Sequence, residues 1–319
     1  MSVDTSPAAA QGLVLPFLID VGERKAALRG RLARVDEVAS SILSRHDYPS
    51  AVAELSAESM ALAACLATTM DYDGVFTLQA SGNGDVKTLF ADVTSSGAMR
   101  AYAQHDEELD PATPLGAPAP LIGLMGTGYL AFTVDQGEQG RYQGIVPIED
   151  ADLTGVAMRY FADSEQIDTA LLIAALPKIS GPITSGPKKS QPTDAGGWHA
   201  AALMLQRIPE TGGTNDAPII SAEEDDIWHT ACTLMATCTR DELVDPELAP
   251  ADLLRRLFHE LDVSVLPLRE ITDECRCSPD RVDRMLAGLS KDERLEFADD
   301  DGMITVACEF CKKEHRSAA

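Results

Sequence analysis

Four cysteines near the C-terminus constrain this chain more than any other feature of its sequence. They form two close pairs, Cys275-Arg276-Cys277 and Cys308-Glu309-Phe310-Cys311, separated by residues 278–307. A tetrahedral Zn²⁺ needs four soft donors directed at one centre, and two short cysteine pairs on separate turns can supply them. The spacing therefore predicts a zinc site whose ligands are Cys275, Cys277, Cys308 and Cys311.

Three other interpretations of these cysteines are weaker. Buried free thiols would have apolar neighbours, whereas the flanking residues are Arg276, Glu309, Lys312 and Lys313. Structural disulfides are typical of secreted chains, and nothing in the sequence indicates secretion. A thioredoxin-like CxxC lies beside a βαβ pattern, whereas Cys308 follows a short hairpin-like run.

The predicted site leaves no position for a catalytic water. Catalytic zinc usually keeps one open position, and here four thiolates occupy all of them. His315, shortly after Cys311, could compete as a ligand, but four sulfurs already satisfy the metal. The chain also has no Gly-x-Ser-x-Gly, no P-loop and no HExxH motif. We therefore expect that the protein is not an enzyme.

The segment around the cysteines reads as a small α+β unit. Ser278-Pro279 predicts the start of a helix, Ser290 to Glu293 form a capping box, and residues 303–306 predict a strand. The hydrophobic core of so small a unit is normally too small to keep it folded without a further stabilising link. A bound zinc ion would supply that link, and loss of the metal should unfold the unit.

The rest of the chain predicts a mixed α/β fold followed by helices. The predicted strands cover residues 13–19, 26–35, 75–80, 89–93, 98–102, 129–134, 141–146, 169–175 and 200–208, and the predicted helices cover 36–43, 50–70 and 152–163. We expect an α+β protein with three parts: a mixed α/β domain at 1–209 with a flexible excursion at 177–197, a helical linker at 210–272, and a zinc domain at 273–319.

The predicted linker has two interpretations. It could be an ordinary helical layer that covers the first domain, or a segment of low intrinsic stability. Its high density of Asp and Glu, together with Pro218, Pro246 and Pro250, is compatible with the second interpretation.

Charge and composition limit the partners and the compartment. The net charge of −25 repels nucleic acid and anionic lipid, so neither is an expected partner. The first apolar run, Leu13 to Ile19, is short and contains Pro16, so we expect no signal peptide and no membrane span. These features favour the reducing cytoplasm. We interpret Cys65, Cys232 and Cys238 as structural.

A zinc ion held by four thiolates can act as a switch. Thiolates are the oxidisable form of cysteine. Oxidation to disulfides removes the ligands and the folding free energy that the metal supplied. A marginally stable unit then unfolds, and whatever it covered becomes exposed.

The sequence resembles the 33 kDa heat-shock chaperone family of redox-regulated holdases. The resemblance extends from about Leu13 to Cys311 and rests on unlinked motifs in the same order. Besides the cysteine pairs, these motifs are His46-Asp47-Tyr48-Pro49, Gly126-Thr127-Gly128-Tyr129, Arg141-Tyr142-Gln143-Gly144-Ile145-Val146, Ser164-Glu165-Gln166 and Met204-Leu205-Gln206.

The resemblance implies an ATP-independent, cytoplasmic stress-response chaperone. It implies a substrate-binding N-terminal domain, a metastable linker and a zinc redox switch, inactive when reduced. Oxidant together with unfolding stress would form the disulfides Cys275–Cys277 and Cys308–Cys311, release zinc and unfold the linker. Apolar surface would then bind unfolding client proteins, and the active form would dimerise.

The sequence departs from the family pattern at two places. The excursion before Trp198 is longer than expected. Glycine and an aromatic residue are expected after Cys311, where Lys312-Lys313-Glu314-His315 stand instead. This tail could loosen the zinc unit and change its redox threshold.

Two other functions remain open from the residues alone. One is a thiol–disulfide oxidoreductase in which Cys308 and Cys311 turn over catalytically. The other is a zinc-stabilised adaptor without a redox response.

Overall fold

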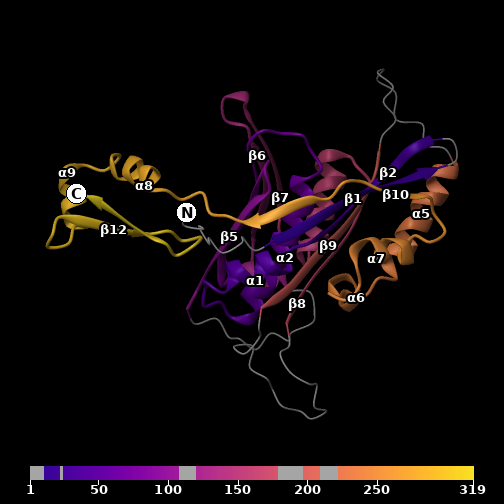
Figure 1. Cartoon of the computed structure of the whole chain (residues 1–319), viewed down its shortest axis with the longest axis horizontal. Helices are drawn as coiled ribbons and strands as arrows, with labels where there is room; N and C mark the ends of the chain where they lie inside the picture. The colour runs from indigo at the N-terminus through magenta and orange to yellow at the C-terminus, as the bar shows by residue number, and fades with distance from the viewer. Residues whose placement is uncertain (1–10, 22–23, 108–119, 179–196, 209–221) are drawn as a thin grey trace, which may run out of the picture. The chain divides into compact units, whose positions relative to one another are not determined.

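The protein forms two compact units, residues 1–273 and 274–319. The computed structural model describes residues 11–21, 24–107, 120–178, 197–208 and 222–319 (Figure 1). The predicted flexible excursion at 177–197 lies outside the described residues, except at its two ends.

The larger unit is built on one sheet of eleven described strands. Its order is β7-β6-β3-β4-β5-β11-β1-β2-β9-β8, and β10 pairs with β1 beside β11. All neighbours are antiparallel except the parallel pair of β11 and β5. The strands are β1 (Gln11–Val21), β2 (Arg24–Arg34), β3 (Val75–Gly82), β4 (Val86–Thr94), β5 (Ala98–His105), β6 (Gly128–Asp135), β7 (Arg141–Pro147), β8 (Thr169–Pro177), β9 (Trp198–Arg207), β10 (Val263–Val265) and β11 (Arg269–Asp273).

Two helices, α1 (Asp36–Leu43) and α2 (Ser50–Ala67), pack on one face of the sheet. Every residue of α2 is buried, Cys65 included. By length and composition alone α2 could cross a membrane, with a mean hydropathy of 1.3. Because it is wholly enclosed by the unit, its apolar composition is that of a core helix.

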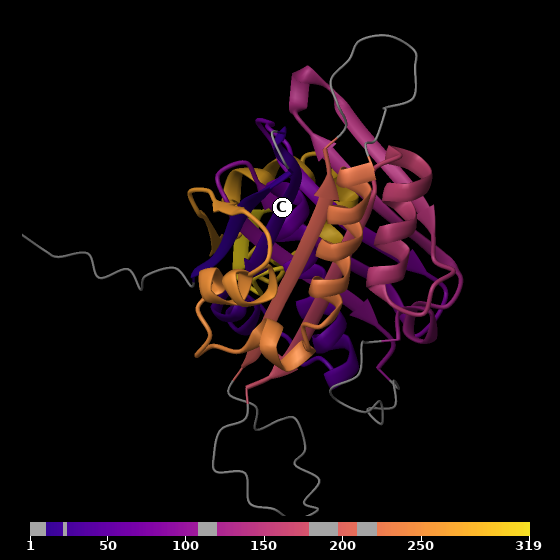
Figure 2. The same cartoon turned by 90° about the vertical axis from the view of Figure 1, so that its right-hand side faces the viewer.

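Three helices cover the opposite face over β1, β2, β8 and β9. They are α5 (Ala222–Ala236), α6 (Arg240–Val244) and α7 (Pro250–Leu257), which Figure 2 shows in front of these strands. Since side chains alternate along a strand, Val14 packs toward α2 while Leu15 and Phe17 pack toward α5–α7. This part of the sheet is therefore buried on both faces.

Two further α-helices lie among the described residues of the larger unit. Asp152 accepts a hydrogen bond from the Gly155 N–H at 2.8 Å and caps α4 (Leu153–Tyr160). The short helix α3 (Leu121–Met125) was not predicted, because its five residues are too few to show a helical period.

The smaller unit contains α8 (Pro279–Leu286), α9 (Lys291–Glu296) and a two-stranded sheet of β12 (Met303–Ala307) and β13 (Glu314–Ala318). Ser278 caps α8 and the capping box at Ser290 opens α9, as the sequence predicts. Its buried apolar cluster is small and consists of Val282, Leu286 and Ile304.

The predicted fold class, a mixed α/β protein with a C-terminal four-cysteine unit, is confirmed. The segment assigned to a helical linker needs one correction. Residues 222–257 do contain α5, α6 and α7, but β10 and β11 follow and join the sheet of the larger unit. β10 has only three residues, and β11 has five of which three are charged, so neither is long and apolar enough to be predicted as a strand.

Candidate metal centre

The four predicted ligands sit at the ends of regular elements. Cys275 and Cys277 lie between β11 and α8, and Cys308 and Cys311 lie in the turn between β12 and β13. The backbone closes this turn with two hydrogen bonds, from the Lys312 N–H to the Cys308 carbonyl at 2.7 Å and from the Cys308 N–H to the Lys313 carbonyl at 2.9 Å. The short strands thus hold the second cysteine pair in a fixed turn.

The structure brings all four sulfurs together. Their Sγ atoms lie within 4.8 Å of one another, with Cys275 and Cys308 at 3.7 Å and Cys277 and Cys311 at 3.4 Å. A tetrahedral ion with metal–sulfur bonds of about 2.3 Å would separate its ligands by about 3.8 Å. The cluster therefore fits a metal ion with four thiolate ligands. Both of these contacts join one cysteine pair to the other, so they do not by themselves select a disulfide pattern.

The cysteines of the cluster differ in their acidity. Burial is the main cause that raises the pKa of Cys275 and of Cys277 above the ordinary thiol value. Burial, the largest single cause, acts in the same direction on Cys308, but hydrogen bonds from the backbone N–H groups of Cys311 and Phe310 and from the thiols of Cys275 and Cys311 together lower the pKa of Cys308. A metal ion binds only the deprotonated form of cysteine. A bound cation would therefore favour the thiolate form of all four residues.

His315 lies beside the cluster but outside the group of mutually close ligand atoms. It is buried, with 5% of its surface exposed, and its Nε2 lies 3.3 Å from the Cys277 Sγ. The expectation that the four sulfurs leave no place for His315 in the ligand set stays a prediction. Its contact with Cys277 was not predicted, because the polar strand β13 shows no apolar alternation.

The other three cysteines lie in the larger unit and are poorly reactive. Burial raises the pKa of Cys65 to about 12 and those of Cys232 and Cys238 to about 11. Thiols of this kind are inert toward oxidants and metals at neutral pH. This supports their structural interpretation.

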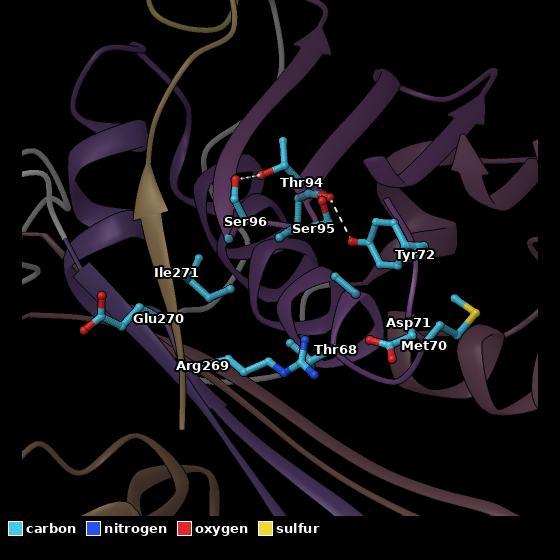
Figure 3. Close-up of a pocket in the computed structure, with 13 residues that line it drawn as sticks. Thr68, Met70, Asp71, Tyr72, Thr94, Ser95, Ser96, Arg269, Glu270 and Ile271 are labelled. Atoms are coloured by element: carbon cyan, nitrogen blue, oxygen red, sulfur yellow. Dashed lines mark hydrogen bonds between the residues drawn. The ribbon is translucent and has the colours of Figure 1, made fainter. Parts of the chain in front are cut away.

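A polar pocket of about 460 Å³ lies in the larger unit (Figure 3). Arg269, Glu270 and Ile271 of β11 form one wall, and the end of α2 and the turn between β4 and β5 form the others. The Thr94 and Ser96 hydroxyls are hydrogen bonded to each other at 2.8 Å. Among the described residues that line the pocket there is no cysteine and no histidine.

Two arginines attach α6 and the loop after it to the rest of the larger unit, and neither contact was predicted. Arg240 on α6 contacts two buried carboxylates of α2, Glu54 at 2.8 Å and Glu58 at 3.0 Å. Arg34 on β2 donates to the backbone carbonyls of Leu243, Asp245 and Leu248 at 2.6–3.2 Å. These contacts join residues far apart in the sequence, so local patterns give no sign of them.

The fold and the cluster together define a class: a mixed α/β unit built on one large sheet, followed by a small unit whose four clustered cysteines could hold a metal ion. Residues 18–317 match the family described as Hsp33 protein. The chain therefore belongs to the Hsp33 family of chaperones, which confirms the resemblance found in its motifs.

Individual relatives agree with this assignment. The chain is 34% identical over 291 residues to the 33 kDa chaperonin of Caulobacter vibrioides, covering 91% of this chain and 90% of that protein. It is 32% identical over 289 residues to the 33 kDa chaperonin of Ectopseudomonas mendocina, covering 90% and 87%. Its fold is similar to the crystal structure of the 33 kDa chaperonin of Thermotoga maritima, with a TM-score of 0.74, 22% identity and coverage of 95% and 94%.

Proposed function

We propose that this protein is a redox-regulated, ATP-independent holdase that binds unfolding proteins after oxidation of its four-cysteine centre. The observation that carries the proposal is the clustering of four sulfurs within 4.8 Å in a unit with only three buried apolar residues among those described. Such a core is too small to hold the unit folded alone. The metal is therefore the element on which its fold depends.

The ligand chemistry supports zinc, held by Cys275, Cys277, Cys308 and Cys311. When bound, zinc fixes the four thiolates and supplies folding free energy without redox chemistry of its own. The cluster offers four ligand atoms among the described residues. A tetrahedral ion bound there would have all four coordination positions filled by sulfur, with none left for a substrate. A holdase without enzymatic turnover fits this arrangement better than a hydrolase does.

Oxidation of the sulfurs would act as the switch. A thiolate attacks hydrogen peroxide, forming a sulfur–oxygen bond while the oxygen–oxygen bond breaks and hydroxide leaves. The second thiolate of the pair attacks that sulfur, a disulfide forms, and a second hydroxide leaves; the two hydroxides take up protons as water. Two electrons pass from each cysteine pair to one peroxide. We assign the disulfides Cys275–Cys277 and Cys308–Cys311, after which the oxidised sulfurs no longer hold the metal.

Unfolding of the smaller unit would affect the larger unit through the strand β11 that directly precedes it. Glu274 alone separates Cys275 from β11, whose Asp273 binds Arg45 at 2.7 Å and 2.8 Å and Ser41 at 2.7 Å. We infer that release of this strand weakens the attachment of α5–α7, the metastable linker of this proposal. Their departure would expose the face that contains Leu15, Phe17, Ile19, Leu28, Leu32, Leu203 and Leu205, which we assign as the client-binding surface.

The remaining expectations belong to the same proposal. Two copies that each expose this apolar face would associate, so the oxidised form is a homodimer. The cytoplasm, where thiols are kept reduced, is the compartment in which such a switch responds to oxidative stress. The net charge of −25 argues against nucleic acid or anionic membranes as partners.

A combined measurement on the full-length chain tests the proposal. Reduced protein should carry one zinc ion per chain and should not suppress the aggregation of a thermally unfolding client protein. Peroxide at elevated temperature should release the zinc, remove four titratable thiols and produce suppression without ATP. Equal suppression by both forms, or a metal-free reduced protein with an ordered C-terminal unit, would refute it.

A matched pair of variants separates the centre from the other thiols. Cys308→Ser should lose zinc and melt the smaller unit, whereas Cys232→Ser, outside the cluster, should keep both zinc and switching. Insulin reduction with many turnovers would instead favour the oxidoreductase, and zinc retention under peroxide would favour the adaptor.

A further inference from the structure

The cysteine cluster has a buried polar neighbour that the proposed function does not use. His315 lies at the second position of β13, and Val306 of β12 is its partner in the register. Its neighbours Glu314 and Arg316 are exposed, whereas His315 is buried because side chains alternate along the strand. Strand pairing thus directs this imidazole into the smaller unit.

The imidazole reaches one sulfur of the cluster. Its Nε2 lies 3.3 Å from the Cys277 Sγ, within the range of a hydrogen bond to sulfur. A metal-bound thiolate carries no proton and can only accept. The contact is therefore favourable when Nε2 carries the hydrogen and donates it to Cys277.

We propose that His315 donates a hydrogen bond to the Cys277 thiolate, strengthens metal retention and slows oxidation of that sulfur. The inference rests on the proposed function, because it assigns a regulator to the same centre. Hydrogen bonds around a ligand set tune its affinity for the metal, typically by about 10- to 100-fold on mutation. A lone pair engaged by an N–H group is also less available for attack on an oxidant.

The step affected is the oxidation of the pair formed by Cys275 and Cys277. The Cys277 sulfur attacks hydrogen peroxide, forming the sulfur–oxygen bond as the oxygen–oxygen bond breaks and hydroxide leaves. The Cys275 sulfur then displaces the second hydroxide, and the pair has given two electrons to the peroxide. His315 sets how readily this pair is oxidised, so it raises the oxidant concentration at which the pair responds.

Two substitutions at this position separate hydrogen bonding from packing. His315→Phe keeps a planar ring but removes the donor, and His315→Gln keeps an N–H group near the position of Nε2. His259, on the surface after α7 with 62% of its side chain exposed, provides the control His259→Phe. All are made in the full-length, reduced, zinc-loaded protein.

The readouts are zinc affinity, by competition with a chromogenic chelator, and the rate of zinc release under hydrogen peroxide. We expect His315→Phe to lose affinity and to release zinc faster, on the order of tenfold. His315→Gln should restore most of both, and His259→Phe should match the wild type. Wild-type affinity and rate in His315→Phe, or an equal defect in His315→Gln, would overturn the inference.

A spectroscopic measurement on the wild type covers the case in which His315→Phe does not fold. Nitrogen-15 NMR of the zinc-loaded protein should identify the Nε2-protonated tautomer of His315. The Nδ1-protonated tautomer would refute the hydrogen bond. If the wild type itself binds no zinc, the proposed function fails; if it binds and releases zinc but His315 has no effect, only this inference fails.

Discussion

Lys312 has a backbone conformation that is unfavourable for its residue type. Its φ of 59° lies in the left-handed region, and among the described non-glycine residues only Gln166 shares this sign. The position directly follows Cys311 and closes the cysteine turn through the Cys308 carbonyl. A side chain at such a φ costs about 1–2 kcal/mol relative to glycine. This explains why glycine is expected here from the family resemblance.

Lys312→Gly should therefore stabilise the smaller unit. The strain is relieved, while the ion pair lost between Lys312 and Glu309 is exposed at both ends and contributes little. We expect a gain of about 1 kcal/mol in the zinc-loaded unit and slower zinc loss to a chelator. Lys313→Gly, one residue further and without a positive φ, is the control. A less stable Lys312→Gly variant would contradict the strain argument.

The attachment of α6 to α2 rests on a contact between one guanidinium and two buried carboxylates. Glu54 and Glu58 are 1% and 2% exposed, and Arg240 also donates to the carbonyl of Ala175 at 3.1 Å. Removal of one partner from a buried ionic contact typically costs about 3–5 kcal/mol, because the other charge remains buried and unpaired. The attachment of α6 to α2 is therefore sensitive to this arginine.

Arg240→Ala should loosen α5–α7 in the reduced protein. We expect a loss of about 3–5 kcal/mol near pH 8, seen as faster amide hydrogen exchange in residues 222–257 and a lower melting temperature. Arg255→Ala serves as the control, because Arg255 on α7 is 73% exposed and pairs only with Asp252 among the described residues. Similar exchange in both variants would show that Arg240 does not hold the helices.

The same carboxylates predict a pH dependence. Burial is the main cause that raises the pKa of Glu54 from 4.5 to about 7 and that of Glu58 from 4.5 to about 8, against the opposing effect of Arg240. The folded unit therefore retains protons that the unfolded chain loses. The resulting stability is fully present below about pH 4.5 and is lost as the pH rises through 7 and 8.

Glu54→Gln should weaken this dependence. One of the two carboxylates that share Arg240 no longer titrates, so the free energy of unfolding should fall less between pH 5 and pH 9 than in the wild type. Urea unfolding at several pH values measures it, and Glu247→Gln, on the surface between α6 and α7, is the control. Parallel curves for Glu54→Gln and the wild type would exclude a titrating Glu54.

These elements also show how far the sequence alone could lead. The cysteine spacing predicted the four sulfurs that the structure brings together, and the caps at Ser278 and Ser290 predicted the starts of α8 and α9, because these signals are local. The contact of Arg240 with Glu54 and that of His315 with Cys277 could not be predicted. Each contact depends on how segments far apart in the sequence pack together. The spacing of apolar residues within one segment carries no information about that packing.

At the scale of the whole molecule, the proposed switch requires one apolar face to be covered in the reduced state and open in the oxidised state. Phe258, directly after α7, is buried between the helices α5–α7 and this face of the sheet. It is 1% exposed, and its ring centroid is 5.7 Å from that of Phe17 on β1. The contact belongs to the cluster that joins α5–α7 to the sheet. Weakening it should favour the open state without any change at the cysteines.

Phe258→Ala should thus make the reduced, zinc-loaded protein partly active. Truncation of a buried phenylalanine costs about 3–5 kcal/mol, and this loss falls on the covered state alone if the helices are released in the active form. We expect the variant to bind a hydrophobic dye and to suppress client aggregation at temperatures where the wild type does neither. Phe297→Ala, at a residue of the smaller unit that is 65% exposed, should behave as the wild type. A Phe258→Ala variant that melts earlier yet stays inactive until it is oxidised would show that release of α5–α7 is not the activating step.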